Sequence, residues 1–136
     1  FYGLLFMTQV NRPTSPHLTI YKPQMTSVLS ITHRMTGLAL YVGALAMVAW
    51  LVLAAYAPSH YAKWYMCASS WAGRVVLVGF LLAFYYHLAN GIRHLFWDIG
   101  KGYSLRAATV SGWLVLLFTL AATAGSVVYI YSLSRA

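Results

Sequence analysis

The sequence predicts an all-α membrane protein with three transmembrane helices and an irregular, proline-containing N-terminal arm. Hydrophobic residues make up 61% of the 136 residues and charged residues only 7%, and the mean hydropathy is +0.69. These values lie far from those of soluble domains. Because a transmembrane helix needs about 20 apolar residues, the chain has room for three spans but not for a separate soluble catalytic domain.

The N-terminal arm, residues 1–27, is expected to be irregular or extended. Three of the four prolines fall within it, namely Pro13, Pro16 and Pro23. Each proline removes a backbone donor and disfavours helix at the residue before it. Thr26 or Ser27 is the expected cap of the helix that follows. The opening hexapeptide FYGLLF is too short for a signal peptide with a basic start and a cleavage site, and its origin stays open.

Three apolar segments follow the arm and form with it a single membrane-anchor domain over residues 1–136. The first segment runs over residues 28–57, the second over 71–98 and the third over 105–131. Residues 58–70 are expected to form a loop. The third segment is the most uniformly apolar, and each segment is long enough to cross a bilayer.

The positions of Lys and Arg predict the orientation in the membrane. Nine of these residues stand against one acid, Asp98, which gives a net charge of +8. With three spans, the arm and the loop at 98–106 share one side, which collects Arg12, Lys22, Arg34, Arg93, Lys101 and Arg106. The positive-inside rule therefore predicts an N-terminus on the cytoplasmic or matrix side. Cations at the ends of apolar runs contact phospholipid headgroups, so nucleic-acid binding is not expected.

The segment HLANGIRHLFWD, residues 87–98, brings polar side chains into the end of the second span. At about 100° per residue, His87, Gly91, His94 and Asp98 fall within about 40° of one helix stripe. Counting about 1.5 Å per residue from Asp98, His87 lies about 16 Å deep. An imidazole at that depth needs a partner.

Two interpretations of His87 are open at this point. It can donate a hydrogen bond to a neighbouring helix as a structural residue, or it can be an axial ligand of haem iron. Gly91 favours haem, because a residue without a side chain lets a flat macrocycle approach, and His94 could then meet a propionate. The absence of CxxCH excludes covalent attachment, which leaves a b-type haem. His33 could supply the sixth ligand, but it is expected to lie too close to the interface to face His87.

A second polar cluster opens the first span, in TSVLSITHRMTG. Ser27, Ser30 and Arg34 are spaced three and four residues apart and share a helix face. A hydroxyl and a guanidinium on one face can donate hydrogen bonds to the carbonyls of a quinone. Alternatively, Ser27 caps the helix, Ser30 bonds to its own backbone and Arg34 reaches a lipid phosphate. His33 and Arg34 could equally hold haem propionates.

Two blocks of the chain closely resemble the cytochrome b membrane-anchor subunits of succinate dehydrogenase, respiratory complex II. They are RPTSPHLTIYKPQMTSVLSITHRMTG at 12–37 and YHLANGIRHLFWDIGKG at 86–102. The resemblance covers almost the whole chain. It implies one half of a heterodimeric haem-binding helical bundle in a bacterial cytoplasmic membrane or the mitochondrial inner membrane. The implied partners are a second membrane-anchor subunit, an iron–sulfur subunit and a flavoprotein subunit.

The resemblance also implies which residues bind haem b. His87 stands where the family has an axial haem ligand, and the second axial histidine comes from the partner anchor subunit. His33, Arg34 and His94 match positions near the haem propionates.

For ubiquinone, the resemblance implies a site at the start of the first span. Ser30 and Arg34 match the serine and arginine of the family's quinone site, and Ile31 matches an apolar wall of that pocket. Ser27 and Asp98 stand at an implied subunit interface or proton path, Asp98 close to the iron–sulfur subunit.

The expected function is therefore that of a cytochrome b anchor that passes electrons from the iron–sulfur subunit to ubiquinone. Succinate oxidation needs a flavin and a soluble active site, so no catalytic residue is expected in this chain. Two alternatives stay open: an anchor of a quinol:fumarate reductase, which runs the chemistry backwards, and a redox-silent structural anchor. A transporter would spread polar residues over several spans, whereas the third span has only scattered Ser, Thr and Gly.

Overall fold

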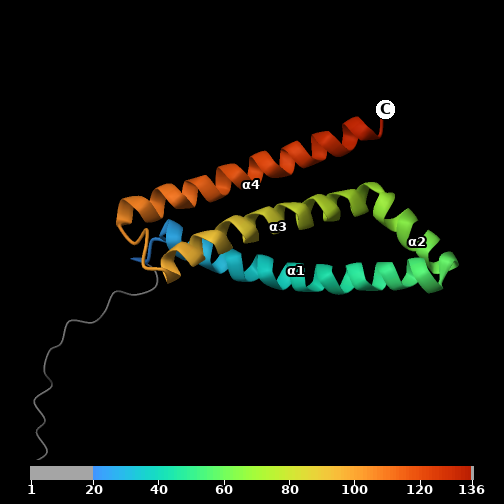
Figure 1. Cartoon of the computed structure of the whole chain (residues 1–136), viewed down its shortest axis with the longest axis horizontal. Helices are drawn as coiled ribbons and strands as arrows, with labels where there is room; N and C mark the ends of the chain where they lie inside the picture. Colours follow the sequence, from blue (N-terminus) through green and yellow to red (C-terminus); the bar gives the residue numbers. More distant parts are fainter. Residues whose placement is uncertain (1–19, 136) are drawn as a thin grey trace, which may run out of the picture.

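The computed structural model describes residues 20–135, which form an all-helical bundle without a strand in that range (Figure 1). The helices are α1 (Met25–Tyr56), α2 (Pro58–Ser69), α3 (Trp71–Asp98) and α4 (Leu105–Leu133). Of these, α1, α3 and α4 are long and apolar enough to cross a membrane. The predicted fold class, with three membrane spans, is confirmed. Most of the predicted arm, residues 1–19, lies outside the described residues.

The first span begins three residues earlier than the sequence predicted. Its N-cap is Gln24, which makes no side-chain capping hydrogen bond, so the prediction that Thr26 or Ser27 caps this helix is wrong. The side chain of Met25 lies close to Gly112 of α4. Packing at this contact favours a helical turn through Met25, which a reading of local capping signals does not detect.

The segment predicted to be a loop between the first two spans is the helix α2. Pro58 stands in its first turn, where the fixed φ of proline suits a helix and the missing N–H is not needed. Tyr61 meets Trp50 of α1, with ring centroids 6.1 Å apart. None of the residues of α2 is buried. The loop prediction failed because a short helix that buries nothing has no apolar periodicity to reveal it.

The junction between α2 and α3 is tight enough to require a glycine. Ser70 caps α3, because its Oγ accepts a hydrogen bond from the backbone N–H of Gly73 at 3.1 Å. A Cβ atom at Gly73 would overlap the carbonyl oxygen of Cys67 and would lie 2.6 Å from that of Ala68. Since backbone atoms form this contact, a side-chain rotation cannot relieve it.

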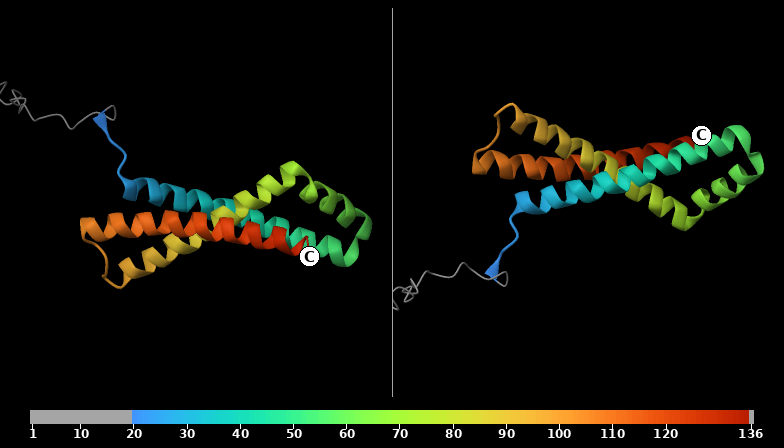
Figure 2. Two further views of the ribbon diagram at one scale, coloured as in Figure 1. Left: turned by 90° about the horizontal axis from the view of Figure 1, so that it is seen from above. Right: turned by 90° about the horizontal axis from the view of Figure 1, so that it is seen from below.

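The third helix, α3, lies between α1 and α4 and contacts both (Figure 1). Both views in Figure 2 show it crossing the other two spans at an angle. Leu29, Tyr86 and Val115, one from each span, form the buried apolar cluster. α1, which is described in full, buries only Leu29. The spans therefore leave most of their apolar surface outside the bundle, as expected for helices surrounded by lipid and by other membrane subunits.

The turn between α3 and α4 brings the ends of two spans together. Gly100 and Gly102 have φ values of 77° and 83°, in the left-handed region that glycine adopts without strain. Trp97 Nε1 donates to the carbonyl of Gly102 at 3.2 Å, and the Tyr103 hydroxyl donates to the carbonyl of Trp97 at 2.6 Å. The start of α1, the end of α3 and the start of α4 consequently gather at one end of the bundle, here called the polar end (Figure 1).

We expect Gly73→Ala to destabilise the protein by about 1–3 kcal/mol, because the added methyl group overlaps backbone oxygens and forces α2 and α3 apart. The matched control is Gly79→Ala in the same helix, where an added Cβ meets nothing within 4 Å. The measurement is the midpoint of thermal unfolding of the protein purified in detergent. Equal midpoints for the two variants would contradict the packing at this junction.

Candidate functional site

The polar end of α3 presents two faces with different surroundings. The first face carries the predicted stripe and meets α1 at His33. The second face, which the sequence did not reveal as a site, is buried between α1 and α4 and consists of Tyr86, Asn90 and Arg93. The two faces are described in turn.

Three members of the predicted stripe converge on the ring of His33. The His87 and His33 rings are stacked, with centroids 4.0 Å apart and an interplanar angle of 11°. The His94 ring is tilted against His33 with centroids 5.1 Å apart. A Cβ atom at Gly91 would lie 3.8 Å from Cε1 of His33. The fourth member, Asp98, is exposed at the end of α3.

The expectation that His33 lies too shallow to face His87 is therefore wrong. Because α1 begins at Met25, His33 is eight residues into its helix, about 12 Å along the axis. His87 lies eleven residues before Asp98, where α3 ends at the polar end of the bundle, which is about 16 Å along the helix axis. Side chains easily bridge the remaining difference of about 4 Å.

The hydrogen bonds of His87 identify which ring nitrogen carries the proton. Its Nδ1 lies 3.2 Å from the carbonyl oxygen of His33 and 3.3 Å from Oγ1 of Thr36. The hydroxyl of Thr36 is 2.9 Å from the carbonyls of Thr32 and His33 and donates its proton to the backbone. Both neighbours of Nδ1 are thus acceptors, which assigns the proton to Nδ1 and leaves the lone pair on Nε2.

A glycine on α1 makes room for this imidazole. A Cβ atom at Gly37 would lie 3.0 Å from Cε1 of His87 and 3.5 Å from its Nδ1. The ring is half-buried, held by α1 through one nitrogen and free to bind through the other. A histidine that donates Nδ1–H to a backbone carbonyl and offers Nε2 is the usual form of a metal-ligating histidine.

His33 takes a different part in the site from His87. His33 and His87 turn their ring faces to each other, so the two rings do not direct a nitrogen at one shared atom between them. The Nδ1 of His33 is buried and has no hydrogen-bond partner within residues 20–135. Buried polar atoms are normally paired, so this nitrogen is available to an incoming acceptor or donor.

The second face of α3 is a buried hydrogen-bond network that joins three helices. Asn90 is fully buried and donates through Nδ2 to the carbonyl of Leu29 in α1 at 3.4 Å. The Tyr86 hydroxyl donates to the same carbonyl at 2.8 Å. Arg93 donates to Oδ1 of Asn90 at 3.4 Å and to the carbonyl of Ala108 in α4 at 2.9 Å.

Arg93 is the centre of this network and is only 5% exposed. Its Nε donates to Oγ of Ser111 at 2.9 Å, and its guanidinium carbon lies 4.0 Å from the centroid of the Trp97 ring. From the sequence, Arg93 was predicted only to add to the positive charge on one side of the membrane. A signal was present, because residues 86, 90, 93 and 97 repeat the spacing of the histidine stripe one residue earlier, on the neighbouring face of the helix.

The residues predicted to bind a quinone lie on a flank of α1 that residues 20–135 leave partly open. Ser27 and Ser30 are half-buried, Arg34 is exposed and Ile31 is 58% exposed. The hydrogen bonds that join α1 to α3 use Leu29, His33 and Thr36 instead. A site built on this flank would need walls from outside the described part of the chain.

Comparisons with known proteins reveal clear relatives. A family model described as succinate dehydrogenase/fumarate reductase transmembrane subunit matches residues 8–125. The succinate dehydrogenase cytochrome b556 subunit of Rickettsia typhi is 51% identical over 112 residues, 82% of this chain and 87% of the relative. The b556 subunit of Paracoccus denitrificans is 41% identical over 72% of this chain and 75% of the relative's length. The mitochondrial cytochrome b560 subunit of Sus scrofa is 38% identical over 85% of this chain and 69% of its own.

Arg93→Lys should lower the stability of the bundle by about 1–3 kcal/mol, because an ammonium group cannot replace the forked hydrogen bonds of a guanidinium. The change keeps the positive charge, so it tests the shape of the guanidinium group, with its hydrogen bonds and its contact with Trp97. Arg106→Lys is the matched control, since Arg106 is exposed at the start of α4. The readout is the thermal unfolding midpoint in detergent, and an unchanged midpoint for Arg93→Lys would refute the central position of this side chain.

Proposed function

This chain belongs to the family of succinate dehydrogenase and fumarate reductase transmembrane subunits, and from that membership we propose that it is the cytochrome b anchor of a succinate:ubiquinone oxidoreductase. In this role it binds haem b and forms part of the site where ubiquinone is reduced. The single observation that carries the haem assignment is the hydrogen bond from Nδ1 of His87 to the carbonyl of His33 at 3.2 Å. It fixes the ring and leaves Nε2 as the only nitrogen of His87 that can bind iron.

The described residues fit a haem held between two protein chains. His87 would hold the iron through Nε2, whereas His33 stacks face to face on His87 and would not share the metal with it. The second ligand histidine is proposed to come from a partner anchor subunit, as the family membership implies. When bound, haem b supplies a one-electron redox centre within the bundle.

The same neighbourhood contains groups suited to the haem propionates. His33 has a buried, unpaired Nδ1 within the described chain, and His94 lies against the His33 ring on the side of the polar end. Arg34, the next residue along α1, is exposed and charged. Charged donors bind carboxylates more strongly than neutral ones, so Arg34 is proposed to hold a propionate, with His33 and His94 as further N–H donors.

Ubiquinone is proposed to bind on the open flank of α1. Arg34 and Ser30 point to one site because they are four residues apart on a helix face. Their guanidinium and hydroxyl groups donate hydrogen bonds to the quinone carbonyls and stabilise the negative charge that grows there as electrons arrive. Ile31, with its exposed side chain, supplies an apolar contact for the ring. The remaining walls come from the partner subunits.

Protons and electrons are proposed to reach the quinone at the polar end of the bundle. Reduction of ubiquinone to ubiquinol consumes two electrons and two protons, and the polar end carries Asp98 and His33 as proton-exchanging groups. Ser27, one turn before Ser30, borders the proposed subunit interface. The iron–sulfur subunit docks at this end, with the flavoprotein subunit beyond it. The excess of Lys and Arg predicts that this is the cytoplasmic or matrix side.

The relatives favour succinate oxidation as the direction of the reaction. Those described above carry the name succinate dehydrogenase, although the family description also includes fumarate reductase. The proposed residues serve either direction, because hydrogen bonds to a quinone carbonyl also orient a quinol.

Replacement of the proposed iron ligand tests the haem assignment. We expect His87→Ala to abolish the low-spin b-type absorption bands of the purified complex in a dithionite-reduced minus oxidised spectrum. His60→Ala is the matched control, because His60 is an exposed histidine in α2 and should leave the bands unchanged. A normal b-type spectrum in the His87 variant would refute its assignment as ligand. A wild-type complex without such bands would instead favour the redox-silent anchor.

Replacement of Arg34 tests the quinone site. We expect Arg34→Ala to lower succinate:ubiquinone reductase activity by about tenfold or more, the effect of losing a charged hydrogen bond of about 1.5–3 kcal/mol. Succinate oxidation with an artificial electron acceptor should be preserved, since the contacts between α1 and α3 do not use Arg34. Arg106→Ala serves as the control. Equal loss of both activities would indicate an assembly role and contradict the proposed quinone contact.

A further inference from the structure

A groove between α3 and α4 opens at the polar end of the bundle, on the face of α3 that also carries the buried network. Its volume is about 390 Å³, and apolar side chains such as Ile92, Leu114 and Phe118 form most of its lining. These three side chains are about half exposed, at 47%, 59% and 48%. The groove is therefore open along its side, toward the lipid that surrounds a membrane span.

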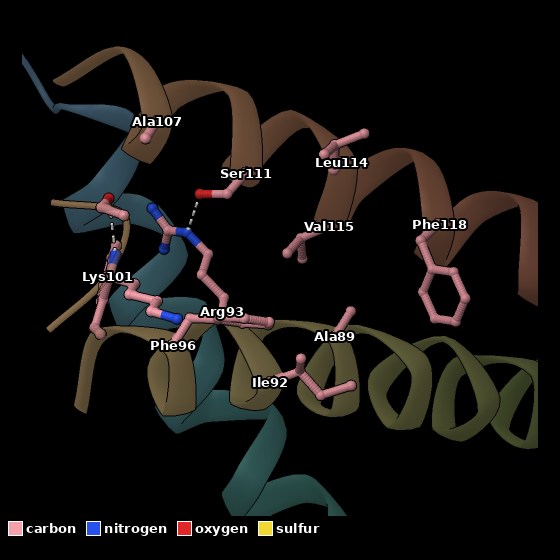
Figure 3. Close-up of a pocket in the computed structure, with 12 residues that line it drawn as sticks. Ala89, Ile92, Arg93, Phe96, Lys101, Ala107, Ser111, Leu114, Val115 and Phe118 are labelled. Atoms are coloured by element: carbon pink, nitrogen blue, oxygen red, sulfur yellow. Dashed lines mark hydrogen bonds between the residues drawn. The ribbon is translucent and has the colours of Figure 1, made fainter. Parts of the chain in front are cut away.

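Two cationic residues lie at one end of this groove. Figure 3 shows Arg93 and Lys101 together at that end, while Phe118 lies at the opposite end. The three hydrogen-bond acceptors of Arg93 are a hydroxyl, an amide and a carbonyl oxygen, and none of them is negatively charged. Arg93 therefore brings an unbalanced positive charge to this end of the groove, although the residue is only 5% exposed. Lys101 is exposed there and presents its ammonium group to an incoming anion.

The length of the groove matches one leaflet of a bilayer. Ala107 and Phe118 line its two ends on α4, and eleven residues of helix span about 16 Å. Half of a hydrocarbon core of about 30 Å is about 15 Å. An acyl chain that starts beside the cations would therefore reach Phe118 near the bilayer centre.

We propose that this groove binds one anionic glycerophospholipid from the leaflet at the polar end. Its phosphate lies against the exposed Lys101 and close to the buried charge of Arg93, and an acyl chain follows the apolar wall between α3 and α4. The lipid completes the charge balance of Arg93 and fills the space between the two helices. The proposal is independent of the haem and quinone assignments, because His87, Ser30 and Arg34 do not line this groove.

Charge complementarity distinguishes this occupant from a transmembrane helix of another subunit. An apolar helix laid into the groove would cover the exposed Lys101, beside the charge of Arg93, without offering an anion, and burying an unbalanced charge is unfavourable. A phospholipid offers a phosphate to the cations at one end of the groove and an apolar chain to the apolar side chains that lead to Phe118.

The test measures lipid retention on the purified complex. The delipidated complex in detergent is titrated with phosphatidylglycerol, and bound lipid is counted by native mass spectrometry. A juxtamembrane Lys contributes about 1 kcal/mol to anionic lipid binding, so Lys101→Gln should weaken binding about fivefold. Lys22→Gln is the matched control, an exposed lysine at the same end but outside the groove. Leu114→Trp, which fills the groove from its exposed rim, should also weaken binding.

The outcomes separate this proposal from its rivals. Tight binding of phosphatidylglycerol, weaker binding of phosphatidylcholine and a selective loss in Lys101→Gln support it. Equal losses in the Lys101 and Lys22 variants would overturn it in favour of unspecific surface lipid. Displacement of the lipid by inorganic phosphate would indicate an ion site without a place for the acyl chain. Absence of any retained phosphatidylglycerol would indicate that another subunit covers the groove.

Discussion

The hydrogen bonds of Arg93 and Asn90 connect the three membrane spans, and the rest of the arrangement depends on them. Asn90 reaches α1 through the carbonyl of Leu29, and Arg93 reaches α4 through Ala108 and Ser111. Between lipid-exposed helices the hydrophobic effect offers little driving force, because lipid chains are as apolar as leucine. Hydrogen bonds and close packing must therefore hold the helices in place. A buried arginine also needs these hydrogen-bond partners, because the membrane interior contains no water to replace them.

This network on one face of α3 fixes the position of the polar residues on the neighbouring face. With α3 tied to α1 at Leu29, His87 comes to lie one to two helical turns further along α1, beside the carbonyl of His33 and above Gly37. The same contact decides the protonation of the imidazole and leaves one nitrogen for a ligand. The buried network and the histidine stripe thus occupy adjacent faces of one helix end.

The described helices also leave large apolar and polar surfaces uncovered. α1 buries only Leu29, and the flank with Ser30 and Arg34 stays open. These features fit a chain whose open helix faces are covered by other molecules in the membrane. The groove beside Arg93 is a further open surface, and its chemistry suits a lipid better than a protein. Membership in the family of succinate dehydrogenase and fumarate reductase transmembrane subunits agrees with this open geometry.

The sequence by itself determined the features that depend on local composition and period. Hydropathy located three spans, and the 3.6-residue period placed His87, Gly91 and His94 on one face of α3. Only the tertiary structure decided which partner each face meets. It buried Arg93 between helices, stacked His33 on His87 and turned the expected loop into α2. The physical reason is that these outcomes depend on contacts between different helices. The hydrogen bonds from α1 to α3 join residues 51 to 61 positions apart, and those from α3 to α4 join residues 15 to 41 positions apart.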